Sequence, residues 1–120
     1  MKARSRPVVL PIAVTETTEG QKVSITGRID VRTVPDVRQA LHEIVDTGTG
    51  EVLLDLSRAE IGDATALGML VESYRRARRR ARRISITAMT PRTARLLRGA
   101  RLERALVRRG GAPTVSPVTA

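Results

Sequence analysis

Cysteine is absent from the 120 residues, and aromatic side chains are almost absent, since Tyr74 is the only one. Without cysteine the chain has no disulfide, no thiol nucleophile and no thiolate metal ligand. Without aromatic rings it lacks the stacking platform on which proteins bind single-stranded nucleic acids. One histidine, His42, leaves too few imidazoles for most zinc sites, so we expect neither a metal nor a cofactor. The core must therefore consist mainly of aliphatic side chains.

Long apolar runs are also lacking. The run behind the basic N-terminus, residues 8–14, is interrupted by Pro11, and no small-residue cleavage site follows it. It is too short to span a bilayer, so we interpret it as a strand and expect a cytoplasmic protein without a transmembrane segment. The length suits one domain, predicted over residues 1–109, and residues 110–120 are predicted to form a flexible tail.

Acidic residues are scarce in the second half of the chain. Of the net charge of +10, residues 1–74 contribute −3, from 8 basic and 11 acidic side chains, and residues 75–120 contribute +13, from 14 basic and 1 acidic. Five arginines are predicted on the solvated face of an amphipathic helix: Arg75, Arg76, Arg79, Arg80 and Arg83. The alternative is a patch for nucleic acid or anionic lipid. Because no base-reading motif accompanies these arginines, direct binding of nucleic acid is not expected.

The order of hydrophobic patterns predicts an α/β fold. Two β-rich runs joined by a glycine-ended turn predict an N-terminal hairpin, and helices alternate with strands after it, so the later strands should be parallel. The predicted strands are residues 8–15, 21–26, 52–56 and 84–88, and the predicted helices are residues 34–45, 66–83 and 91–97, with a last helical turn near 102–107.

Apolar residues at helical spacing mark the buried faces of the two long helices. In the first helix they are Val34, Val37, Leu41, Ile44 and Val45, and in the second they are Leu67, Leu70, Val71, Tyr74, Ala77 and Ala81. Arg78 falls inside the second stripe. Thr33 is the predicted N-cap of the first helix, and Thr90 caps the third helix, which has Pro91 in its first turn.

Residues 61–68, Ile-Gly-Asp-Ala-Thr-Ala-Leu-Gly, connect an apolar strand to the second helix. Asp63 is the predicted N-cap of that helix. A helix N-terminus presents unpaired N–H groups and the positive end of the dipole, so this turn suits binding of an anion or a protein partner.

No catalytic constellation accompanies this turn. A Ser-His-Asp arrangement would have to use His42, which has no motif around it. No glycine-rich loop has the strand-loop-helix spacing of a phosphate-binding site, and no small-molecule substrate is indicated. We therefore expect a binding protein that is not an enzyme.

Several short motifs in a fixed order resemble those of one family. They are Gly-Arg-Ile-Asp at 27–30, Val-Pro at 34–35 before a helix, Leu-Leu-Asp-Leu-Ser at 53–57, the turn at 61–68, and Pro91 before a leucine-bearing helix. Over residues 8–108 the chain resembles a STAS domain, and most of all the bacterial anti-sigma factor antagonists. The resemblance implies a STAS-type mixed β-sheet with helices packed against it.

The resemblance also implies a partner and a site. In the family the turn reads Asp-Ser-Ser-Gly-Leu-Gly or Asp-Ser-Thr-Gly-Leu-Gly, and a serine-kinase-type anti-sigma factor phosphorylates the first hydroxyl residue. The unphosphorylated antagonist binds this kinase and so releases sigma factor, which regulates transcription. Carried over by position, the partner-binding residues are Asp30, Asp63, Ala64, Thr65, Ala66, Leu67 and Gly68.

Ala64 departs from the family at the phosphoacceptor position, because it has no hydroxyl. Either Thr65 is phosphorylated one position along, or the protein binds its partner without this switch. We favour the second, since a shift of one residue turns a helical side chain by about 100°. A rival hypothesis is a STAS subunit of a phospholipid-transport ABC complex, in which the same turn binds without being phosphorylated.

Overall fold

A five-stranded sheet runs through the described part of the chain, which comprises residues 10–106 and 114–115 of a computed structural model. Its strands, in spatial as well as sequence order, are β1 (Ile12–Glu16), β2 (Gly20–Ile29), β3 (Glu51–Ile61), β4 (Arg83–Met89) and β5 (Thr114–Val115). The helices of this part are α1 (Val34–Thr47), α2 (Ala64–Arg79), α3 (Pro91–Gly99) and α4 (Glu103–Leu106).

The strand directions confirm the predicted topology. β1 and β2 form an antiparallel hairpin, and β2, β3 and β4 are parallel neighbours separated by α1 and α2. The carboxyl ends of these three parallel strands therefore meet at one edge of the sheet, which is the edge where α/β proteins commonly bind ligands. Residue Asp30 follows β2 at this edge, Asp63 follows β3, and Thr90 follows β4.

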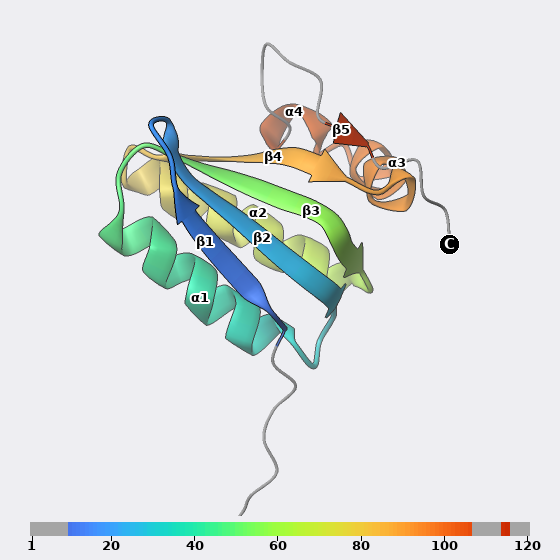
Figure 1. The fold of residues 1–120 in the computed structure, drawn as a ribbon. Coiled ribbons are helices and arrows are strands. Elements are labelled where there is room, and N and C mark those ends of the chain that lie inside the picture. Colours follow the sequence, from blue (N-terminus) through green and yellow to red (C-terminus); the bar gives the residue numbers. More distant parts are fainter. Residues whose placement is uncertain (1–9, 107–113, 116–120) are drawn as a thin grey trace, which may run out of the picture.

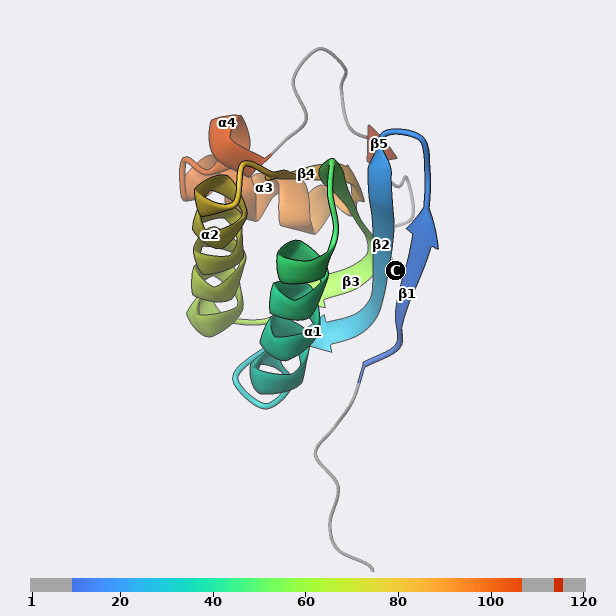
Figure 2. The same cartoon turned by 90° about the vertical axis from the view of Figure 1, so that its left-hand side faces the viewer.

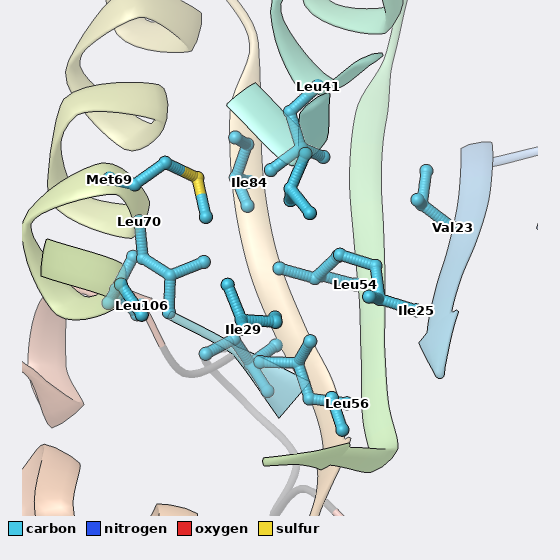
Figure 3. Packing of buried hydrophobic residues seen from close by; sticks show 14 of the residues in the cluster. Val23, Ile25, Ile29, Leu41, Leu54, Leu56, Met69, Leu70, Ile84 and Leu106 are labelled. Atoms are coloured by element: carbon cyan, nitrogen blue, oxygen red, sulfur yellow. The ribbon is translucent and has the colours of Figure 1, made fainter. Parts of the chain in front are cut away.

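The helices lie on one side of the sheet, with α1 and α2 side by side (Figures 1 and 2). The core fills the layer between them, where aliphatic side chains of the strands, such as Ile25 and Leu54, meet Leu41 of α1 and Leu70 of α2 (Figure 3). All five residues of the predicted α1 stripe are buried, which confirms the periodicity that predicted this helix.

The buried face of α2 differs from the predicted stripe. Its buried residues are Ala66, Met69, Leu70, Ser73 and Ala77, whereas Leu67, Val71 and Tyr74 are only partly buried and Arg78 and Ala81 are exposed. The reason is that a polar residue occupies the centre of the face: the Ser73 hydroxyl lies 3.7 Å from the Met69 sulfur, inside the core. Ala81 lies beyond the helix in a left-handed conformation, with φ of 58°, which ends α2 before residue 83.

Two strands extend further than predicted. β2 continues through Gly27 to Ile29, although those residues were expected to end it, and β3 continues from the predicted Leu56 to Ile61. Their extensions pair with each other in parallel register, Ile29 opposite Ile61, after an irregularity near Ser24. Pairing between segments far apart in sequence thus stabilises strands whose local composition does not predict them.

Of the described C-terminal elements, α3 and α4 agree with the predictions, whereas β5 was not predicted. Thr90 caps α3, because its side chain accepts a hydrogen bond from the N–H of Thr93. Leu106 of α4 is buried, while Val107 lies outside the described residues. Within the predicted tail, β5 pairs in parallel with β4, and the other residues of 110–120 are also outside the described part, so the flexible tail stays a prediction.

Arg82 is an unpredicted part of the core. Its side chain is buried between α1 and the turn that follows this helix, and its guanidinium N–H groups all find acceptors. The acceptors are the backbone carbonyls of Ile44 (2.6 Å), Val45 (3.1 Å), Thr49 (3.0 Å) and Gly50 (2.9 Å), together with Gln21 Oε1 (2.8 Å). The cation thus satisfies carbonyls at the C-terminus of α1, where the helix dipole favours positive charge.

Candidate functional site

The carboxylate of Asp63 joins two separate segments of the chain. As the N-cap of α2, Asp63 accepts a hydrogen bond from the Ala66 N–H through Oδ1 at 3.0 Å, which confirms the predicted cap. Its other oxygen, Oδ2, accepts the N–H of Val31 at 2.9 Å. Val31 lies in the loop between β2 and α1, so one side chain fixes the position of this loop relative to the start of α2.

Asp30 organises the same loop from within. Its Oδ1 accepts the N–H of Arg32 at 2.9 Å, and its Oδ2 lies 3.1 Å from Arg28 Nε. The N–H of Arg32 and then the Arg28 guanidinium hold the pKa of Asp30 below its ordinary value, so this carboxylate is ionised at neutral pH. The predicted N-cap Thr33 does not cap α1 with its side chain, because its hydroxyl accepts the Asp30 N–H at 3.0 Å and donates to the Arg28 carbonyl.

Arg28 connects this loop to the turn before α2. Its guanidinium donates to Glu60 Oε2 at 2.9 Å and to the Gly62 carbonyl at 3.2 Å. A side chain at Gly62 would press against the guanidinium, since an added Cβ would lie 2.8 Å from its central carbon. The Gly62 N–H in turn donates to the Ile29 carbonyl at 2.8 Å. These contacts make the β2–α1 loop and the β3–α2 turn a single hydrogen-bonded unit.

Sequence reasoning did not identify Arg28, Glu60 or Arg92 as parts of this unit. Arg92, at the start of α3, lies 3.6 Å from the same Glu60 oxygen that Arg28 contacts. The only available signal was the place of Arg28 within the Gly-Arg-Ile-Asp motif. Since these side chains are largely exposed, their ion pairs contribute little to stability, and their effect is to orient the loops.

Small and apolar residues surround this unit on the surface. Ala64, Thr65 and Gly68 are exposed on the first turns of α2, and Leu67 is partly exposed. Val31 is 62% exposed, which is unusual for a large apolar side chain. We name Val31, Ala64, Thr65, Leu67 and Gly68 the candidate surface.

The predicted site residues fall into three groups in the structure, and one of them comprises the residues that lie in the candidate surface: Ala64, Thr65, Leu67 and Gly68. Asp30 and Asp63 are brought to one edge of the sheet, and they hold the loops that carry the candidate surface. Ala66, by contrast, is fully buried, so its side chain supports α2 from the core and presents no atom to a partner. Val31 was not predicted, although an apolar residue within a polar loop was a signal that could have found it.

Two arginines of the predicted solvated face are bound to α1 instead. Arg76 forms a two-pronged pair with Asp46, with Nε to Oδ1 at 3.0 Å and Nη2 to Oδ2 at 2.8 Å, and Arg80 Nε lies 2.8 Å from the same Oδ1. The Arg76 guanidinium also lowers the pKa of Asp46. Arg75 and Arg79 are exposed as predicted. These two pairs connect the end of α2 with α1, whereas Arg83, which was predicted on the same helix face, begins β4 and is partly buried.

Comparisons with known proteins agree on the fold. A protein-family model described as "Mlab, STAS domain" matches residues 12–108. Among solved structures, the chain is similar to the anti-sigma factor antagonist SpoIIAA in its unphosphorylated form, with a TM-score of 0.64 and 15% identity over 81% of this chain and 86% of that one. It is also similar to an anti-sigma factor antagonist from Mycobacterium paratuberculosis, with a TM-score of 0.65 and 20% identity over 91% and 86% of the two chains. No curated protein sequence gives a significant match.

No helix within the described residues 10–106 combines the length and the apolar character that crossing a bilayer requires.

Proposed function

Because the chain belongs to the STAS domain family, we propose that it is an anti-sigma factor antagonist. In this proposal it binds a serine-kinase-type anti-sigma factor through the candidate surface and so releases sigma factor. The chain acts by sequestering the anti-sigma factor, and it catalyses no reaction itself.

The observation that carries the proposal is the double role of Asp63. Asp63 caps α2 through Oδ1 and also holds the Val31 N–H through Oδ2, so it adds a direct link between α2 and the β2–α1 loop to the contacts that Arg28 makes with the β3–α2 turn. The loop and the first turns of α2 therefore present one preorganised surface, and preorganisation reduces the entropy that binding costs. The exposed Val31 side chain gives this surface an apolar anchor, beside small residues that allow close approach of a partner.

The same surface supports binding without the phosphorylation switch of the resembled family. Ala64 occupies the position of the phosphoacceptor and is exposed, so a partner can reach it but finds no hydroxyl. Thr65 is exposed as well, but it points about 100° further around the helix axis. A phosphate would add nearly two negative charges. We propose that this charge is not added, and that the complex is controlled by the amounts of the partners.

A second candidate function is a STAS subunit of a phospholipid-transport ABC complex. The missing hydroxyl at Ala64 favours it equally, because such a subunit would dock without being phosphorylated. The description of the matching family model names no anti-sigma factor, so the two functions have to be separated by identifying the partner.

The partner test uses purified full-length protein and the kinase-type anti-sigma factors encoded by the same genome. We expect at least one of them to form a complex, and Val31→Ser to weaken that complex about tenfold or more, because the substitution removes an apolar anchor. The matched control is Val14→Ser. Val14 is 45% exposed and lies on β1, outside the candidate surface, so this substitution should leave the affinity unchanged. Binding only to a transporter ATPase would show that the second function is correct.

The switch is tested on the same complex by adding ATP and weighing the intact protein. We expect no phosphate on the wild type, and one phosphate with a weakened complex for Ala64→Ser, which restores the hydroxyl of the resembled family. A phosphate on the wild type that disappears in Thr65→Ala would contradict the proposal and identify Thr65 as the acceptor.

A further inference from the structure

Arginine recurs at every third residue along α3 and α4. The row consists of Arg92, Arg95, Arg98, Arg101 and Arg104, and all five residues are exposed. We infer that this arginine row is a second interaction surface, which contacts an acidic surface on the protein partner that the candidate surface binds. The inference rests on the proposed function and adds to it the chemistry of the partner.

The charge of the row is almost uncompensated. Among the described residues, its only ion pair is the 3.6 Å contact between Arg92 and Glu60. Glu103 is the only acidic residue from position 92 to position 120, so this part of the chain holds a single carboxylate side chain against the five arginines of the row. The arginines near the end of α2 differ in this respect, because Arg76 and Arg80 are paired with Asp46.

The row begins beside the candidate surface. α3 follows the carboxyl end of β4, at the edge of the sheet where β2 and β3 also end (Figure 1). Arg92 and Arg28 approach the same oxygen of Glu60, and Arg28 orients the loop that carries Val31. A partner seated on the candidate surface would therefore lie next to α3.

The surroundings of the row favour a protein over a membrane or nucleic acid. Peripheral membrane helices insert apolar side chains between their basic residues. Here Leu96 and Leu102 pack against the core and are not free to insert. Binding of nucleic acid is typically supported by base-reading or stacking side chains, and residues 92–120 include no aromatic residue.

Exposed charges of this kind act mainly on the rate of association. They attract an oppositely charged partner over several ångströms, and salt screens this attraction beyond a Debye length of about 8 Å at physiological ionic strength. Removing the row should therefore slow association more than it speeds dissociation, and the difference should shrink as salt is added.

The experiment measures association of the full chain with the anti-sigma factor that binds it, at low and at physiological salt. For the variant R95E/R98E/R101E we expect roughly a tenfold or greater loss of association rate at low salt. The matched control R75E/R78E/R79E changes the charge equally on exposed residues near the other end of α2, and it should lose clearly less. The variant R95Q/R98Q/R101Q removes the charges but retains long polar side chains, so it should also associate more slowly. Thermal unfolding followed by circular dichroism verifies that it is folded.

The outcomes separate this inference from the proposed function. If the wild type binds the anti-sigma factor and both row variants associate at the same rate, the inference about the arginine row is refuted and the proposed function is unaffected. Absence of wild-type binding to any anti-sigma factor overturns both. A short random-sequence DNA duplex and vesicles of anionic phospholipid serve as further probes. The inference is wrong if either probe binds the wild type but not the row variants, while the association rate with the anti-sigma factor is the same for all of them. The row would then bind phosphate groups.

Discussion

Replacing Arg82 should destabilise the domain more than any other arginine substitution on α2 or after it. Arg82 is 6% exposed, and burial lowers the pKa of its guanidinium because the charged form is removed from water. Five hydrogen bonds offset that cost in the native state. Alanine would remove all of them and leave the acceptors at the end of α1 without donors.

The magnitude follows from how many of these bonds water can replace. The bonds to Ile44, Val45 and Gln21 are buried, whereas the carbonyls of residues 49 and 50 belong to an exposed turn that water can reach. A buried hydrogen bond to a charged donor contributes at least about 1.5 kcal/mol, so three of them give about 4–5 kcal/mol or more for Arg82→Ala. This is a large part of the 5–15 kcal/mol typical of a domain, and it corresponds to a fall in Tm of about 15 °C or more.

Urea denaturation followed by circular dichroism measures this effect. Arg82→Lys should recover only a small part of the loss, because a single ammonium group cannot reach acceptors that are spread around the edge of the planar guanidinium. The control is Arg79→Ala, an exposed position on α2, which should change the free energy of unfolding by less than about 0.5 kcal/mol. If Arg82→Ala changed it by less than about 1 kcal/mol, the network would not have the role assigned to it.

Two further predictions concern stability. Gly20→Ala should destabilise the domain by about 2 kcal/mol or more, because φ is +151° there and the new Cβ would collide with the backbone of Glu51. Gly68→Ala has open space around the new Cβ and should stabilise α2 by up to about 1 kcal/mol. The same urea titration measures both effects. Burial, and then the charge of Arg76, lowers the pKa of His42 below its ordinary 6.5. As pH falls from about 7 to about 5, the unfolded chain therefore binds the proton first, and the free energy of unfolding should decrease with a slope that His42→Gln removes. A slope equal in wild type and variant would contradict the assignment to His42.

The predictions from sequence succeeded where a short stretch of chain carries the signal. The α1 stripe from Val34 to Val45 was complete because helical spacing is a local property. The cap at Asp63 was likewise found because a carboxylate before a helix binds N–H groups within three residues. The missing hydroxyl at Ala64 needed no structure at all.

The predictions failed where a distant contact decides the outcome. Ser73 is buried in α2 because of what packs around it, although its polarity argued for the surface. The extension of β3 to Ile61 depends on pairing with β2, which local composition does not reveal. Arg82 was indistinguishable in the sequence from its exposed neighbours in the arginine run, and only its surroundings in the fold differ.

The sequence by itself thus determined an aliphatic core, the order of helices and strands, and a helix-capping carboxylate at a turn that lacks the phosphoacceptor. The tertiary structure decided which groups meet. The hydrogen bond from Val31 to Asp63 joins residues 32 positions apart, and that from Arg82 to Gln21 joins residues 61 positions apart. Such pairs depend on the register of the parallel strands and the packing of α1 on α2, and no spacing within a local stretch encodes them. The candidate surface exists for this reason: Asp63 was visible in the sequence, but Val31 comes to its side only in the folded chain.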